Sequence, residues 1–185
     1  MEIMVPDPAG LTLLFIRHAE KPIKNGPNGV DIDGNSDPES LIPHGWSRTG
    51  AWVQLFVPAL GGTSPVPTPT AIFASEPGNG SKSERPLETA TPLATMLGLT
   101  VDQSFGLGQE PALAAAIEKT TGVVLVCWQH ESIDAIVAAL TDPPTVPSWP
   151  KTCFNGMFRL DRSSTGWNYT LLMPVLLAGD TSTPF

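Results

Sequence analysis

Two runs of apolar residues, each ending on a histidine, constrain the fold of this chain more than any other feature. They are LTLLFIRH at residues 11–18 and GVVLVCWQH at residues 122–130. Neither run alternates between apolar and polar residues, so each strand must be buried on both faces, as in a sheet covered by helices. A shorter run, AIFAS at residues 71–75, has the same character. These segments predict the inner strands of a largely parallel sheet.

Helical segments are predicted between these strands. In residues 47–60, Trp52, Leu55 and Phe56 follow a helical spacing, and residues 81–99 begin with good N-cap residues. Further helices are predicted at residues 109–120 and 131–142, a weak strand at 100–105, and two late strands at 153–160 and 167–177 around a turn at 161–166. Residues 23–43 have no apolar period and predict a long loop. Alternating strands and helices predict an α/β three-layer sandwich with helices on both faces of the sheet.

Length and charge bound the function. The 185 residues fit one domain spanning residues 1–185, and the net charge of −8 argues against nucleic acid or an anionic membrane as partner. Any anion site must therefore be a local cluster of positive side chains.

Cys127 and Cys153 lack the spacing of metal ligands. We therefore expect free thiols, although a disulfide between the two is left open. The first ten residues contain neither a basic leader nor a long apolar stretch, and we expect a cytoplasmic protein.

Charged side chains follow the predicted strands at one edge of the sheet. Arg17 and His18 end the first strand, His130 ends the strand at 122–130, and Arg85 lies early in the helix after AIFAS. In a parallel sheet these positions face one crevice, into which helix N-termini also point. Guanidinium groups pair with the oxygens of a phosphoryl group, and an imidazole can attack phosphorus. We therefore predict a phosphate site that needs neither a metal nor another cofactor.

Four motifs carry a resemblance to a known family. They are RHAEKP at residues 17–22, LIPHGWSRTGA at 41–51, SKSERPLETA at 81–90 and WQHESI at 128–133. In this order and spacing, the chain resembles the histidine phosphatase superfamily, which includes the phosphoglycerate mutases, over most of its length. The resemblance implies a phosphoglycerate mutase-like fold and a phosphatase that hydrolyses phosphate monoesters.

The resemblance also implies roles for individual residues. His18 is the nucleophile that becomes phosphohistidine, and Arg17, Arg85 and His130 hold the phosphate. The attacking imidazole must be neutral, so its other nitrogen should donate to an acceptor such as a backbone carbonyl. The proton donor to the leaving group is Glu110 as first choice and Glu131 as second. Family members that act on phosphohistidine proteins need no such acid.

Lys21 and Arg48 are candidate contacts for a second anionic group of the substrate, although solvated surface cations are an equal interpretation. The expected partner is a small phosphorylated metabolite or a phosphoprotein, and the sequence does not indicate an oligomeric state. A mutase is less favoured, because such enzymes are usually longer. Two other hypotheses stay open: a protein phosphohistidine phosphatase, and a catalytically idle phosphate-binding module.

Overall fold

The computed structural model describes residues 10–59, 62–78 and 80–185. It is an α/β fold with a central sheet of six strands in the order β5-β4-β6-β1-β7-β8, of which β5, β4, β6 and β1 are parallel. The antiparallel strands β7 and β8 extend the sheet beyond β1. The strands and helices are β1 (Leu11–Arg17), β2 (Gly29–Val30), β3 (Ser36–Asp37), α1 (Pro43–Phe56), β4 (Ala71–Ala74), α2 (Arg85–Leu97), β5 (Val101–Asp102), α3 (Glu110–Ile117), β6 (Gly122–Trp128), a 3₁₀ turn (His130–Ser132), α4 (Ile133–Ala138), β7 (Met157–Ser163) and β8 (Gly166–Leu172).

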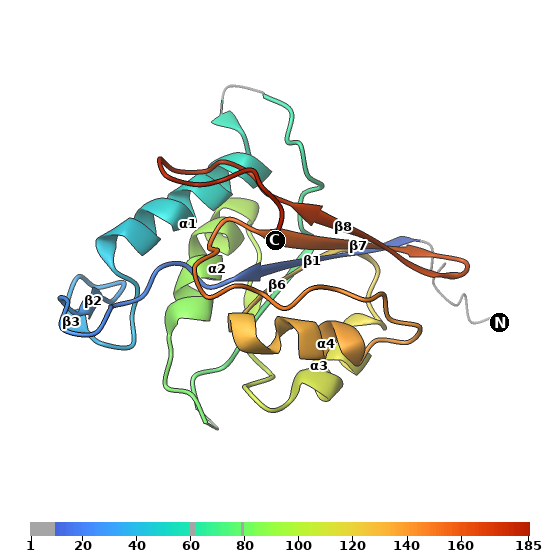
Figure 1. The fold of residues 1–185 in the computed structure, drawn as a ribbon, viewed down its shortest axis with the longest axis horizontal. Coiled ribbons are helices and arrows are strands. Elements are labelled where there is room, and N and C mark those ends of the chain that lie inside the picture. Colours follow the sequence, from blue (N-terminus) through green and yellow to red (C-terminus); the bar gives the residue numbers. More distant parts are fainter. Residues whose placement is uncertain (1–9, 60–61, 79) are drawn as a thin grey trace.

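The two long apolar runs form the adjacent inner strands β1 and β6, as predicted. Their register pairs Leu11 with Gly122 and continues to Arg17 opposite Trp128, so both strands end at the same edge. Helices α1 and α2 cover one face of the sheet, and α3 and α4 cover the other (Figure 1). The predicted three-layer α/β architecture is confirmed.

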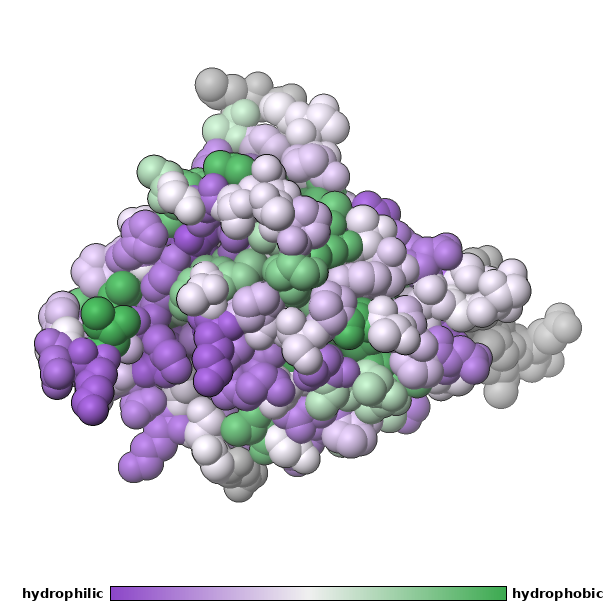
Figure 2. Space-filling view, viewed as in Figure 1, coloured by the Kyte–Doolittle hydropathy of each residue, from purple (hydrophilic) through white to green (hydrophobic). Residues whose placement is uncertain are grey.

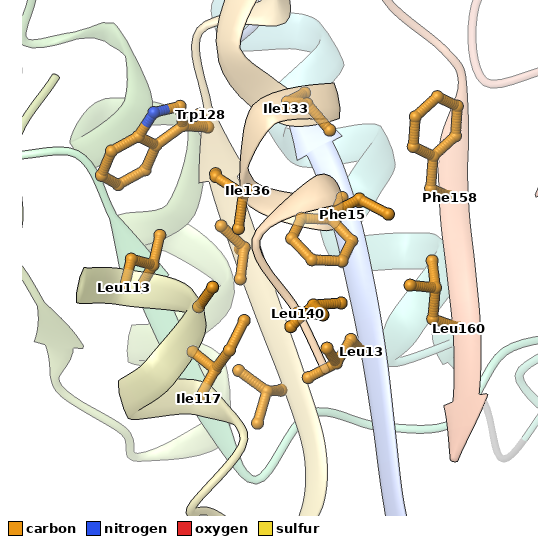
Figure 3. Packing of buried hydrophobic residues seen from close by; sticks show 14 of the residues in the cluster. Leu13, Phe15, Leu113, Ile117, Trp128, Ile133, Ile136, Leu140, Phe158 and Leu160 are labelled. Atoms are coloured by element: carbon orange, nitrogen blue, oxygen red, sulfur yellow. The ribbon is translucent and has the colours of Figure 1, made fainter. Parts of the chain in front are cut away.

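Alternate residues of β1 enter two separate hydrophobic cores. Leu13 and Phe15 pack toward α3 and α4, beside Ile136 and Phe158 (Figure 3). Leu14 and Ile16 face the opposite way, into a cluster that includes residues of α1 and α2. After Thr12, whose hydroxyl donates to Asp161 at 2.7 Å, every residue of β1 is apolar and buried until the strand reaches Arg17. The first polar side chains after the apolar run therefore lie at the edge of the sheet.

Several predicted boundaries were wrong. Helix α1 begins at Pro43 instead of residue 47 and ends at Phe56; the predicted end at residue 60 lies outside the described residues. Proline suits the first helical turn, where its missing N–H is not needed. The predicted helix at 131–142 is divided between the 3₁₀ turn and the shorter α4. The last two strands pair up to Ser163 and Gly166, so the connecting turn is shorter than predicted, and β8 ends at Leu172, two residues before a proline.

The loop at residues 23–43 is not wholly irregular, because β2 and β3 form a small antiparallel hairpin within it. Hydrophilic residues gather on the side of the molecule that holds this hairpin (Figure 2). Cys127 and Cys153 are both free thiols. Within the described ranges, no helix combines the length and apolarity that crossing a bilayer requires.

Candidate functional site

His18 lies directly beyond the carboxyl end of β1, with only 3% of its surface exposed. Its backbone N–H donates to the carbonyl of Trp128 at 3.0 Å and so continues the pairing of β1 with β6. Its Nδ1 is 2.7 Å from the carbonyl oxygen of Ala19, which can only accept, so Nδ1 carries the proton. Burial, and secondly the charge of Arg17, lower the pKa of His18 to about 3. The ring is therefore neutral, with Nε2 free to act as a nucleophile.

Thr89 fixes the loop that carries this histidine. Its Oγ1 accepts a hydrogen bond from the N–H of Ala19 at 2.9 Å and donates to the carbonyl of Arg85 at 2.7 Å. Thr89 is 2% exposed and lies in the first turns of α2. One hydroxyl therefore ties the His18 loop to the helix that begins with Arg85.

Arg17 is buried without a carboxylate partner. Only 1% of the residue is exposed, and its Nη1 donates to the carbonyls of Lys151 at 2.7 Å and Cys153 at 3.2 Å. The ring of Phe154 lies beneath the guanidinium, 3.8 Å from Cζ. Nε has no hydrogen-bond partner, and no carboxylate among residues 10–59, 62–78 and 80–185 comes within ion-pair distance. Burial lowers the pKa of Arg17 to about 10, so it stays charged near neutral pH.

The Nε and Nη2 edge of the Arg17 guanidinium has the geometry for binding an anion through two hydrogen bonds. Nε and Nη2 point in parallel from one edge of a guanidinium, and in the described part of the chain Nη1 makes all of this group's hydrogen bonds. A buried cation with an unpaired N–H is costly unless an anion meets it. This edge can therefore accept two oxygens of a phosphate or carboxylate.

Arg85 is the first residue of α2, and it is partly engaged by the preceding loop. Its Nη2 donates to the carbonyl of Pro38 at 2.6 Å, its Nε to that of Ser40 at 3.3 Å, and its Nη1 to Ser83 Oγ at 3.1 Å. Glu39 lies 3.5 Å away. Thr89 connects the backbone of Arg85 to Ala19, the residue after His18, and the charge of Arg85 contributes to the lowered pKa of His18. Each terminal nitrogen retains one N–H for a ligand.

His130 follows β6 and lies 9% exposed at the same edge of the sheet. Burial and the charges of Arg17, Lys21 and Lys151 lower its pKa, whereas Glu131 raises it. Oε2 of Glu131 is 2.6 Å from His130 Nδ1, although the pair is not aligned as a hydrogen bond. Lys21 is exposed, follows His18 by three residues, and its charge lowers the pKa of both histidines.

Glu110 is the first residue of α3 and is 7% exposed. Its Oε1 accepts hydrogen bonds from Trp128 Nε1 and from the N–H of Gly108, each at 3.2 Å. Trp128 is the register partner of Arg17, which places Glu110 near the same edge of the sheet. No hydrogen bond joins Glu110 to either histidine within the described residues, and Oε2 is the oxygen left for a ligand.

Arg48 is buried in an ion-pair network instead of standing free on the rim. It lies 3% exposed in α1, and both of its terminal nitrogens bind Asp180, at 2.9 and 2.8 Å. Its Nε donates to Glu20 Oε1 at 2.8 Å. The network raises the pKa of Arg48 despite its burial. This geometry favours a structural role over contact with substrate.

The structure therefore brings together Arg17, His18, Arg85, His130 and Lys21. No sequence motif indicated two contributors to this region: the segment 150–153, whose carbonyls bind Arg17, and Asp180, a partner of Arg48. Backbone carbonyls carry no sequence signal. Asp180 comes from the far end of the chain and follows no motif. A local signal did exist for Thr89, which is four residues after Arg85, the spacing at which a helical hydroxyl reaches back to a carbonyl.

No family model matches this chain, and no curated protein matches its sequence. Solved structures do resemble it. A protein named "Mycobacterial hydrolase 2" is 15% identical, with a TM-score of 0.44, over 86% of this chain and 88% of its own. At that level of similarity, function has to be inferred from the geometry of the site itself.

Proposed function

We propose that this protein is a phosphatase that hydrolyses a phosphate monoester through a phosphohistidine at His18. The observation that carries the proposal is the buried guanidinium of Arg17, which has no carboxylate partner in the described chain, beside a neutral imidazole. A structural arginine at this depth would need an internal anion. A phosphoryl group supplies that anion and also gives the imidazole an electrophile.

In the proposed reaction, the substrate phosphate binds the Nε and Nη2 edge of Arg17. The remaining N–H groups of Arg85, with His130, meet its other oxygens. Nε2 of His18 then attacks phosphorus, and the carbonyl of Ala19 stabilises the cation that forms, because it already accepts from Nδ1 at 2.7 Å. Water attacks the phosphohistidine in the second step and releases inorganic phosphate.

Protonation of the leaving alkoxide is assigned to one of two carboxyl groups. Glu110 is buried next to Trp128 and is held by the N–H of Gly108. The side chain of Glu131 is 58% exposed beside His130. Of the two, Glu131 is the one in direct contact with a residue of the proposed phosphate site.

The test is single-turnover trapping with a ³²P-labelled aryl phosphate. The parent protein should accumulate an acid-labile, base-stable phosphoenzyme, and His18→Ala should form none and should lose aryl phosphatase activity. A control is Arg159→Lys in β7, at a partly exposed pair with Asp161 that contacts none of the proposed site residues. If His18→Ala hydrolyses the ester as fast as the parent, the proposal is wrong.

A second candidate is a phosphate-binding module without turnover, in which the site senses a phosphorylated ligand. It is favoured by one observation, the engagement of all three Arg85 nitrogens by protein groups. In that case, orthophosphate would bind but no phosphoenzyme would form.

A further inference from the structure

A cavity of about 430 Å³ adjoins Arg17 on the side of β7 and β8. Its lining includes Pro150 and Cys153, whose carbonyls accept from Arg17, and Phe154, whose ring lies beneath the guanidinium. Glu20, two residues after His18, also lines it. Arg17 and His18 do not line the cavity themselves, but residues that contact Arg17 or follow His18 closely in the chain do.

The walls of the cavity are held by buried hydrogen bonds. Asn155 is 4% exposed, and its amide donates to the carbonyls of Pro174 at 2.9 Å and Thr181 at 2.8 Å. Asp180 accepts the N–H groups of Leu176 and Leu177 in addition to Arg48. The segment after β8 runs over α1 and returns toward β7 (Figure 1). The volume is that of a small-molecule site, and sites of this kind are usually preformed.

The charges lining the cavity select the kind of ligand. Glu20, Asp180 and Arg48 contribute two negative charges and one positive charge, which leaves one negative charge. The two carboxylates share Arg48: Asp180 accepts from both of its terminal nitrogens, and Oε1 of Glu20 accepts from its Nε at 2.8 Å, while Oε2 of Glu20 has no hydrogen-bond partner among the described residues. His44 Nε2 is 3.5 Å from the other oxygen of Glu20. The cavity thus has no free cation for a second anionic group, and its unmatched charge suits a cation.

The opposite polarity surrounds the proposed phosphate site. Arg17 contacts the backbone of Lys151 at 2.7 Å, and Lys21 follows His18 by three residues, so three positively charged residues lie on that side. Phe154, Met173 and Phe185 add apolar surface to the cavity. A ligand that is negative at one end, positive at the other and aliphatic between them matches this distribution.

We propose that the cavity holds the alcohol part of the substrate, and that the substrate is the phosphate ester of an amino alcohol, with its ammonium group beside Glu20. This inference rests on the proposed function. At this end of the substrate it replaces the second anionic group, for which Lys21 and Arg48 were the candidate contacts, by a cationic group. An ammonium there would balance the one negative charge that Arg48 leaves unmatched on Glu20 and Asp180.

The experiment compares three phosphate esters of similar size: O-phosphoethanolamine, ethylene glycol monophosphate and phosphoglycolate, with ammonium, hydroxyl and carboxylate ends. At pH 8, where an imidazole is neutral, kcat/KM for the amine ester should exceed that for the hydroxyl ester by about tenfold or more, the value of one charge-assisted contact. The carboxylate ester should be the poorest. Equal rates, or a preference for the carboxylate ester, would overturn the proposal.

Glu20→Gln tests the residue. A purely structural role would lower both rates in proportion, whereas loss of the selecting charge should reduce the ratio of amine to hydroxyl ester toward one. Glu118→Gln is the matched control, because Glu118 is paired with Arg162 at 2.7 Å and does not line the cavity. The control should leave the ratio unchanged. A ratio that survives Glu20→Gln contradicts the assignment of Glu20.

Calorimetric titration of the His18→Ala protein with the same three esters separates this inference from the proposed function. Preferential binding of the amine ester supports the cavity assignment even if no ester is hydrolysed. The opposite result is also informative. If aryl phosphate hydrolysis depends on His18 but the three esters bind equally well, the proposed phosphatase activity stands and the assignment of the cavity is wrong.

Discussion

Thr89 Oγ1 accepts a hydrogen bond from the N–H of Ala19 at 2.9 Å across 70 positions of sequence. Ala19 in turn accepts from His18 Nδ1 at 2.7 Å. A single residue thus connects the imidazole to helix α2, and the orientation of His18 depends on a hydroxyl that does not contact the ring. Substitution of Thr89 can therefore test how His18 is positioned without changing the imidazole itself.

Thr89→Val keeps the shape of the side chain and removes the acceptor for Ala19. The N–H of Ala19 then loses its partner in a buried place, so the free energy of unfolding should fall by about 1–3 kcal/mol. The rate constant kcat should fall as well, because the loop holding His18 is less fixed. Urea unfolding and phosphatase kinetics measure the two effects, and Thr89→Ser should restore both.

The control is Thr91→Val in the same helix. Its hydroxyl donates only to the carbonyl of Leu87, within α2. Stability should change little and kcat not at all. Equal losses of kcat in the two variants would show that the bond to Ala19 does not position His18.

A second prediction concerns pH. The pKa of His18 is 6.5 in the unfolded chain and about 3 in the folded protein. Between these values the unfolded chain binds more protons, so the contribution of His18 to the free energy of unfolding is fully present above pH 6.5 and declines toward pH 3. The stability difference between the parent and His18→Gln should therefore narrow as pH falls through this window. A difference that stays constant from pH 7 to pH 4 would exclude a buried neutral imidazole.

Arg48→Met tests whether Arg48 is structural. The substitution leaves the carboxylates of Glu20 and Asp180 without their buried partner, so stability should fall by about 3–5 kcal/mol. Arg48→Lys should recover only part of this loss, since an ammonium group cannot bind Asp180 through two nitrogens. Chemical unfolding measures both variants. If stability is unchanged and KM is raised, Arg48 contacts the substrate instead.

Orthophosphate should stabilise the parent protein by binding to the guanidinium of Arg17. At a concentration of 100 times Kd, a ligand that binds only the folded state adds about 2.7 kcal/mol. Arg17→Lys should lose most of this stabilisation, because lysine cannot present two parallel N–H groups. Arg159→Lys, at a partly exposed pair with Asp161, should keep it. Equal thermal shifts with phosphate in both variants would place the anion elsewhere.

The proton donor can be identified by comparing kcat/KM for esters with different leaving groups. Loss of a general acid slows the release of an alkoxide much more than that of an aryl oxide, because an aryl oxide leaves without protonation. If Glu131 is the acid, Glu131→Gln should lower kcat/KM for an alkyl ester by about 10²–10⁴ and leave an aryl ester nearly unaffected. Glu110→Gln is the comparison, and the reverse pattern would assign the role to Glu110.

Much of the fold could be predicted, because the apolar runs of β1 and β6 can only be buried inside a sheet. The position of Arg17, His18 and His130 follows from the same runs, since parallel strands end at one edge. The tautomer of His18 was also predicted, and its bond to the Ala19 carbonyl confirms it.

Other features depend on tertiary contacts that leave no local pattern. In sequence Arg48 is typical of a surface cation, and its pairing with Glu20 and with the distant Asp180 arises only in the folded chain. Helix α1 starts among residues with weak helix propensity, Pro43, His44 and Gly45, where packing of the helix outweighs propensity. The role of residues 150–153 rests on backbone carbonyls, which every residue has.

The place of β1 between β6 and β7 has a consequence for synthesis on the ribosome. Thr12 bonds to Asp161 across 149 positions, so the strand that carries His18 gains both neighbours only when most of the chain has emerged. Contacts this distant slow folding, because long loops must close before they form. A nascent chain stopped before β7 would leave one edge of β1 open, so the surroundings of His18 would be completed among the last features of the protein.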